Sequence, residues 1–318
     1  METGLEVSVT KHLNAMARAS AITAATLALT VASSTTANQL LAHGASASGP
    51  RVASRPPLTS YVAVVDADDK PVTGLTADDF KVWIGNDECR VRDVGKPTEP
   101  LALVIAPAAY RRDVLPLRAA VAAVGDALSR ESSGFEVGLS WQTVRGVTFR
   151  RPGETDGLVA DFNKGLSDSP ALDDGVIGAA RALETRSTKR RVILALARRV
   201  GNTGAARDVM NALQRAKAAL WGVEVAPIAA DGAAGRMAAD GTSGSDLVMT
   251  TAAPWSGGRN ETILDINLIE EATRRQMDLL TNQYAVSFDE PDRIAPGGSI
   301  RIAVRRNGVK IFSAPWLR

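Results

Sequence analysis

Three short, almost purely apolar runs in the middle of the chain restrict the folds that it can adopt. Runs of this length and composition are typical of strands that are covered on both faces of a sheet. They are Leu101–Ile105, Arg191–Leu196 and Val223–Ile228. Between and after them, apolar residues recur at helical spacing, which predicts helices. The predicted helices span 114–130, 173–185, 205–220 and 263–281. This alternation predicts an α/β fold, a three-layer, doubly wound, mostly parallel sheet.

Both ends of this central region carry strand patterns instead. Before the central region, apolar and polar residues alternate over Ser60–Val65 and Leu75–Ile84, which predicts strands. After it, the segment 284–312 is expected to hold two or three further strands. Neither set has enough strands to be stable alone, so we expect the two ends to pack together as a small β subdomain. The predicted organisation is an N-terminal β segment at 58–99, an α/β domain at 100–290 and a C-terminal β segment at 291–318 that packs with 58–99.

The N-terminal residues predict export. The uncharged, mostly apolar segment Ala19–Ala32 follows Lys11 and Arg18 and is too short to cross a bilayer comfortably. A buried amphipathic helix is the alternative, but the segment lacks a polar face. We therefore expect a signal peptide at 1–37, a flexible linker at 38–57 and no membrane span in the mature chain, which would be secreted or periplasmic.

Residue counts exclude several kinds of chemistry. The 318 residues include one cysteine, Cys89, and two histidines, His12 and His43. A disulfide within the chain is therefore impossible, and a folded body beginning near residue 58 has no imidazole for a catalytic triad or a metal site. The net charge of +2 and an aromatic content of 4% argue against nucleic-acid binding. These counts favour a protein that is not an enzyme and that has no cofactor.

Several segments together resemble one family. The stretch Val64–Phe80 is similar to the opening of bacterial, acidobacterial-type von Willebrand factor A-related proteins. The segments Gln283–Phe288 and Ile300–Val304 are similar to the C-terminal signature of the same family. The resemblance covers roughly residues 58 to 318. It implies a von Willebrand factor A-like fold and a protein-binding role.

The family's metal-ion-dependent adhesion site is degenerate in this sequence. The family holds Mg²⁺ or Mn²⁺ with an Asp-x-Ser-x-Ser motif, a threonine and a further aspartate at the carboxyl ends of strands. The corresponding positions here are Ala106, Ala108, Tyr110, Pro170 and Arg198. Alanine and proline side chains offer no oxygen ligand, and a neutral tyrosine hydroxyl is a poor ligand for a hard cation. Arg198 places a positive charge where the cation would lie. The resemblance therefore implies a domain that works without a metal.

Arginines take the place of the metal ligands. Arg111 and Arg112 follow the first strand, and Arg198 and Arg199 follow a later strand whose carboxyl end should lie at the same edge. Guanidinium groups can bind carboxylates through paired hydrogen bonds without a metal. The partner-binding candidates are Tyr110, Arg111, Arg112, Arg198 and Arg199, for an unknown protein or acidic ligand. The alternative is that these arginines are solvated and bind nothing.

Two classes of function remain open. The sequence favours a non-catalytic, secreted or periplasmic protein-binding or scaffold module that is independent of metal. The alternative is a carboxylate-only hydrolase of the cell envelope, which needs two acids converging in one cleft. The acidic cluster of Asp66, Asp68 and Asp69 is expected to shape a turn, although it could in principle bind Ca²⁺.

Overall fold

The computed structural model describes residues 55–108, 110–141, 146–165, 171–198, 206–226, 248–291 and 299–316. The predicted signal peptide and residues 38–54 of the predicted linker lie outside these ranges. Within the described ranges, no helix has both the length and the apolar character that a membrane span requires.

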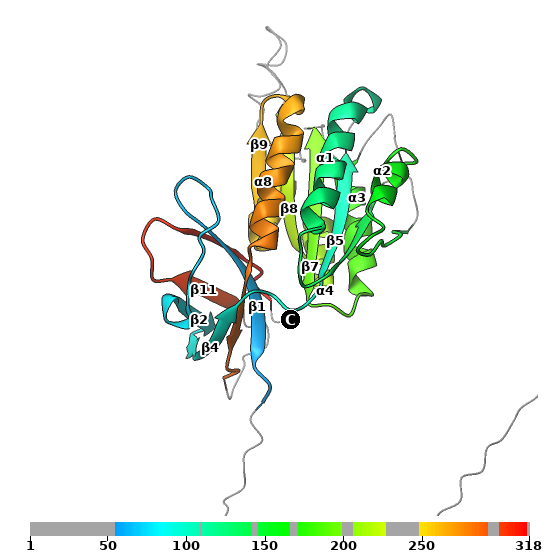
Figure 1. Ribbon diagram of the computed structural model, residues 1–318. Coiled ribbons are helices and arrows are strands. Elements are labelled where there is room, and N and C mark those ends of the chain that lie inside the picture. The colour runs from blue at the N-terminus through cyan, green and yellow to red at the C-terminus, as the bar shows by residue number, and fades with distance from the viewer. Residues whose placement is uncertain are drawn as a thin grey trace, which may run out of the picture. The chain divides into compact units, whose positions relative to one another are not determined.

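A five-stranded parallel sheet forms the centre of the structure (Figure 1). Its strands are β5 (Leu101–Ala108), β6 (Phe135–Leu139), β7 (Arg190–Arg198), β8 (Ala219–Val225) and β9 (Asn260–Ile263). The strand order is β6-β5-β7-β8-β9, and each neighbouring pair is parallel. The first two apolar runs predicted from the sequence are the central strands β5 and β7. The third run overlaps β8, but β8 begins at Ala219, inside the predicted helix 205–220, because α4 ends at Ala216.

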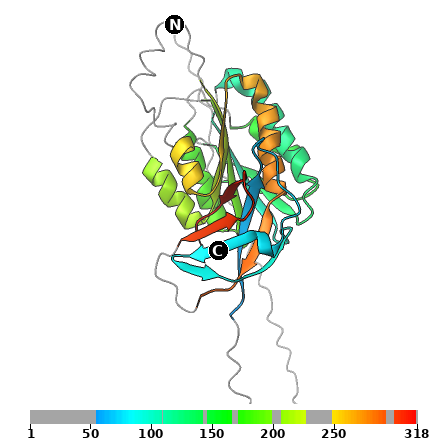
Figure 2. The same ribbon diagram turned by 90° about the vertical axis from the view of Figure 1, so that its left-hand side faces the viewer.

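Helices cover both faces of this sheet. They are α1 (Val114–Leu128), α2 (Asp156–Phe162), α3 (Leu172–Glu184), α4 (Ala206–Ala216), the short α7 (Ala253–Trp255) and α8 (Ile269–Thr281). Figure 2 shows the sheet almost edge-on, with α1 and α8 on one side and the light-green helices α3 and α4 on the other. The predicted three-layer α/β fold is confirmed.

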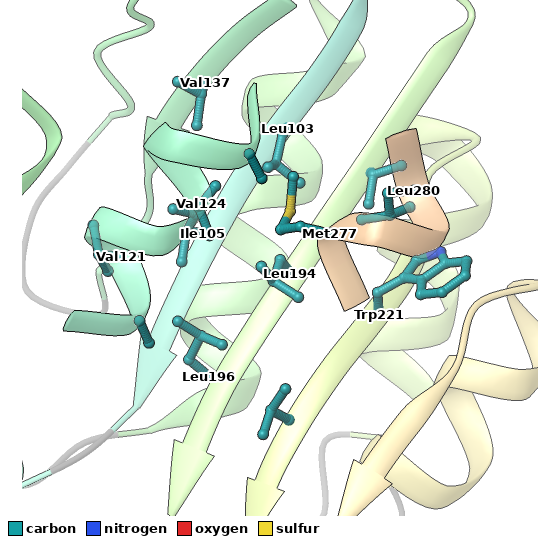
Figure 3. Packing of buried hydrophobic residues seen from close by; sticks show 14 of the residues in the cluster. Leu103, Ile105, Val121, Val124, Val137, Leu194, Leu196, Trp221, Met277 and Leu280 are labelled. Atoms are coloured by element: carbon teal, nitrogen blue, oxygen red, sulfur yellow. The ribbon is translucent and has the colours of Figure 1, made fainter. Parts of the chain in front are cut away.

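Alternation along β5 explains why its sequence is apolar throughout. Leu103 and Ile105 pack with the residues of α1 and α8, whereas Val104 and Ala106 pack with those of α3 and α4. Figure 3 shows the first of these cores, in which Met277 of α8 lies among the strand residues. Since successive side chains of a strand point to opposite faces, a strand covered on both sides has no position left for a polar residue.

The two ends of the chain form a second, smaller core. One sheet has the order β12-β1-β10-β4, and the other has the order β11-β2-β3. The strands are β1 (Leu58–Val65), β2 (Phe80–Ile84), β3 (Asp87–Cys89), β4 (Val91–Gly95), β10 (Tyr284–Phe288), β11 (Ile300–Val304) and β12 (Lys310–Ser313). N-terminal β1 pairs with C-terminal β12, and β2 pairs with β11, both antiparallel. The predicted β subdomain made by both ends is therefore present.

Two further boundaries differ from those expected. Strand β10 lies inside the range 100–290 that the sequence assigned to the α/β domain, yet it pairs with β1 and β4. The last helix begins at Ile269 rather than at 263, because β9 and the 3-10 helix η4 (Ile266–Leu268) precede it. The Asp265 side chain accepts a hydrogen bond from the Asn267 backbone N–H and caps η4. Residues 264–268 therefore lie outside the helical stripe that the sequence pattern suggested.

Candidate binding surface at the carboxyl edge of the sheet

An ion pair joins two loops at the carboxyl edge of the sheet. Arg198 is the last residue of β7, and Asp113 ends the 3-10 helix η2 (Arg111–Asp113) that follows β5. Arg198 donates from Nε to Asp113 Oδ2 at 3.0 Å and from Nη2 to Asp113 Oδ1 at 2.8 Å. The Asp113 side chain is 4% exposed and that of Arg198 is 22% exposed. The two strands are parallel neighbours, so their ends bring these groups together in a planar, two-bond geometry.

This pair changes the electrostatics expected at the edge. The sequence suggested an uncompensated arginine in the place of the family's last aspartate, but Asp113 neutralises the charge of Arg198. Asp113 was missed because it lies beyond Tyr110, outside the motif positions. Its contact with Arg198 depends on the path of η2, which the residue pattern does not specify.

The described residues at the motif positions of this edge do not fit a divalent cation. Ala106 and Ala108 are buried within β5 and carry methyl groups, and both carboxylate oxygens of Asp113 accept hydrogen bonds from Arg198. The nearby hydroxyl of Ser140 donates to the Gly175 carbonyl at 2.9 Å. In the described ranges, no group of three or more His, Cys, Asp or Glu side chains could hold a metal. A hard cation such as Mg²⁺ needs several oxygen ligands. Pro170, at the threonine position, lies outside the described residues.

The predicted partner-binding residues lie beside this ion pair. Arg111 and Arg112 are exposed on η2, and the Arg112 guanidinium lies 5.1 Å from the centre of the Tyr110 ring. The structure therefore brings Tyr110, Arg111 and Arg112 together, next to the Asp113 that holds Arg198. Arg199 lies outside the described residues.

Three exposed leucines extend this surface. Leu115 is 76% exposed, Leu264 is 72% exposed and Leu268 is 46% exposed. Leu115 lies in the first turn of α1, which contacts η4, and Leu264 and Leu268 lie just before and at the end of η4. The carboxyl-edge surface is defined here as Tyr110, Arg111, Arg112, Leu115, Leu264 and Leu268. Helical periodicity places the three leucines on apolar stripes, so it gives no sign that they face solvent.

Other sequence candidates have structural roles. Asp66 Oδ1 accepts the backbone N–H groups of Asp68 and Lys70, each at 2.9 Å, and so closes the turn as expected. Cys89 is buried, and burial raises the pKa of its thiol. A neutral, buried thiol is a poor nucleophile.

Comparison with known proteins gives similarity in structure only. No protein-family model matches the chain, and no curated protein does either. Among solved structures, a von Willebrand factor type A protein from Catenulispora acidiphila matches with a TM-score of 0.42 and 11% identity, over 84% of this chain and 75% of that one. The pilus adhesin SpaC from Lactobacillus rhamnosus GG matches with a TM-score of 0.41 and 10% identity, over 65% of this chain and 35% of that one. BatB, a conserved hypothetical protein from Bacteroides thetaiotaomicron, matches with a TM-score of 0.37 and 14% identity, over 57% of this chain and 98% of that one. Because these TM-scores are below 0.5, the fold assignment rests on the strand order and helix layers of this chain itself.

Proposed function

We propose that this protein is a non-catalytic protein-binding or scaffold module whose carboxyl-edge surface holds its partner without a metal ion. The Arg198–Asp113 ion pair carries this proposal. It joins two of the three loops that hold a metal in von Willebrand factor A domains, and each carboxylate oxygen of Asp113 already accepts a hydrogen bond from Arg198.

The composition of the surface supports protein binding. Tyrosine and arginine are enriched in protein interfaces, and exposed leucines beside them supply apolar area that a partner can bury. The Arg112 guanidinium lies over the Tyr110 ring and can donate paired hydrogen bonds to a carboxylate of the partner. The expected partner is therefore a protein surface that combines acidic and apolar side chains.

Export is part of the proposal. The signal-peptide pattern over residues 1–37 supports a secreted or periplasmic location, with cleavage between about Ser33 and Ser48. Sequencing the N-terminus of protein recovered from the cell envelope tests it, and an intact Met1 on cytosolic protein would contradict it.

The alternative hydrolase has weaker support. Glu131 and Asp278 line one cavity of about 230 Å³, but Glu131 is paired with the buried Arg190 at 3.0 Å. A carboxylate held in a buried ion pair is not available as a general acid.

The experiment is affinity capture from the envelope fraction with immobilised protein, with and without EDTA. The test variant is Arg111→Glu combined with Arg112→Glu. The matched control is Arg130→Glu, an exposed charge reversal just after α1, at the opposite end of that helix. We expect the same captured proteins with and without EDTA, loss of them with the test variant, and retention with the control. Loss with EDTA on the unaltered protein would contradict the proposal.

A further inference from the structure

The strand β9 has an open edge. It is the last strand of its sheet, and within the described residues its partner is β8. The Gly222 N–H donates to the Arg259 carbonyl, and the Ala226 N–H donates to the Ile263 carbonyl, both at 2.8 Å. Backbone groups of alternate residues point to opposite sides of a strand, so the N–H and C=O groups of Asn260 and Thr262 point away from β8. These groups are able to pair with a further strand.

A cleft of about 690 Å³ lies along this edge. Asn260 and Thr262 line it from β9, and all four residues of β12, Lys310–Ser313, line it from the β subdomain. Strand β12 is itself the edge strand of its sheet. Gly257 lies directly against the Ser313 carbonyl, where a Cβ would not fit, so this glycine allows β12 to approach the segment that leads into β9. The open edge of β9 therefore borders an existing groove.

The side chains in the cleft favour an acidic occupant. Arg259 Nη2 donates to Asp69 Oδ2 at 3.0 Å, and Lys310 Nζ donates to Asp69 Oδ1 at 3.2 Å. Two cations therefore share one carboxylate, which leaves a net positive charge. Ile302 and Phe312 supply apolar lining on the same cleft. An extended peptide with alternating acidic and apolar side chains complements this arrangement.

We propose that the cleft binds an extended, acidic peptide segment of a partner protein as an added strand on β9. The peptide backbone pairs with Asn260 and Thr262, while an acidic side chain reaches Arg259 and Lys310. Addition of a strand to an exposed sheet edge is a general mode of peptide recognition. The cleft residues named here do not include any of the six residues of the carboxyl-edge surface, so this proposal can be tested independently of the function proposed above.

The test uses a fluorescein-labelled hexapeptide that alternates valine and glutamate, titrated with the full chain and followed by fluorescence anisotropy. We expect saturable binding, and binding about tenfold weaker for a peptide of the same sequence with methyl groups on alternate backbone nitrogens. Thr262→Pro removes the outward N–H without touching the β8 ladder and should weaken binding by a similar factor. Thr262→Val keeps the N–H and should bind like the unaltered protein, whereas Lys310→Gln should bind more weakly.

Several results would overturn the proposal. They are absence of saturable binding, equal affinity for the methylated peptide, and equal affinity of a folded Thr262→Pro variant. A concentration-dependent dimer in sedimentation, lost in Thr262→Pro, would mean that a second copy covers β9 and would also overturn it. If circular dichroism shows that Thr262→Pro does not fold, the methylated peptide alone decides the question on the unaltered protein.

Discussion

The two ends of strand β7 each carry an arginine in an ion pair, but the two pairs differ in burial and in number of partners. Arg190, at the amino end, is 0% exposed and donates to Glu131 Oε2 at 3.0 Å, Gln283 Oε1 at 3.1 Å and the Leu280 carbonyl at 2.5 Å. Arg198, at the carboxyl end, pairs with Asp113 and retains contact with solvent. Arginine therefore forms a fully buried ion pair at the amino end of β7 and a partly solvent-exposed ion pair at its carboxyl end.

The buried pair supports the fold, whereas the partly exposed pair lies beside the proposed binding surface. Arg190 ties together the loop after α1, the end of α8 and the residue before β10, so it links the α/β layers to the β subdomain. Burial lowers the pKa of Arg190, and the neighbouring Glu131 opposes that effect. Arg198 instead fixes the loop that carries Tyr110, Arg111 and Arg112. Loss of Arg190 contacts should therefore affect stability most, and changes on η2 should affect binding most.

The largest expected effect is that of Glu131→Gln. It leaves the Arg190 charge buried without its counter-ion, so we expect a loss of about 3 to 5 kcal/mol in the free energy of unfolding. Urea denaturation of the variant measures this loss. The double variant with Arg190→Met should lose less than the sum of the two single variants. A loss below about 1 kcal/mol for Glu131→Gln would show that the pair does not hold the fold together.

A smaller effect is expected for Arg198→Met. The buried Asp113 carboxylate then loses two charge-assisted hydrogen bonds, at a cost of about 2 kcal/mol in unfolding free energy. Asp113→Asn should cost less, because Arg198 reaches solvent. The same denaturation series gives both values. If Arg198→Met lowered the free energy of unfolding as much as Glu131→Gln does, the ion pairs at the two ends of β7 would not differ in their contribution to stability.

The smallest effect on stability is expected for Arg111→Glu combined with Arg112→Glu. Both side chains are exposed, so the unfolding free energy should change by within about 0.5 kcal/mol per residue. Binding of the captured partner should nevertheless be lost, and the unaltered protein should bind it more weakly as salt rises. Strong destabilisation would mean that η2 supports the fold instead of presenting a surface.

The central strands could be predicted from the sequence because a strand that is buried on both faces must be apolar along its whole length. The sequence also predicted the β subdomain because neither end of the chain holds enough strands alone. The sequence analysis missed Asp113 because its pairing with Arg198 depends on the path of the 3-10 helix η2. It missed α2 because a helix of seven residues carries too short a periodic pattern. The exposed positions of Leu264 and Leu268 follow from the Asp265 cap, which delays the last helix. The cleft beside β9 depends on the order of the strands in the sheets, and the local periodicity of the residues does not predict that order.

Calorimetric titration of the full chain with Mg²⁺, Mn²⁺ and Ca²⁺ tests metal independence most directly. We expect no saturable heat from the carboxyl edge, because the Asp113 oxygens are held by Arg198 and the remaining motif positions carry Ala106, Ala108 and Tyr110. The matched variant Asp113→Ala should give the same trace as the unaltered protein. A saturable micromolar site that disappears in Asp113→Ala would contradict the metal-free mechanism.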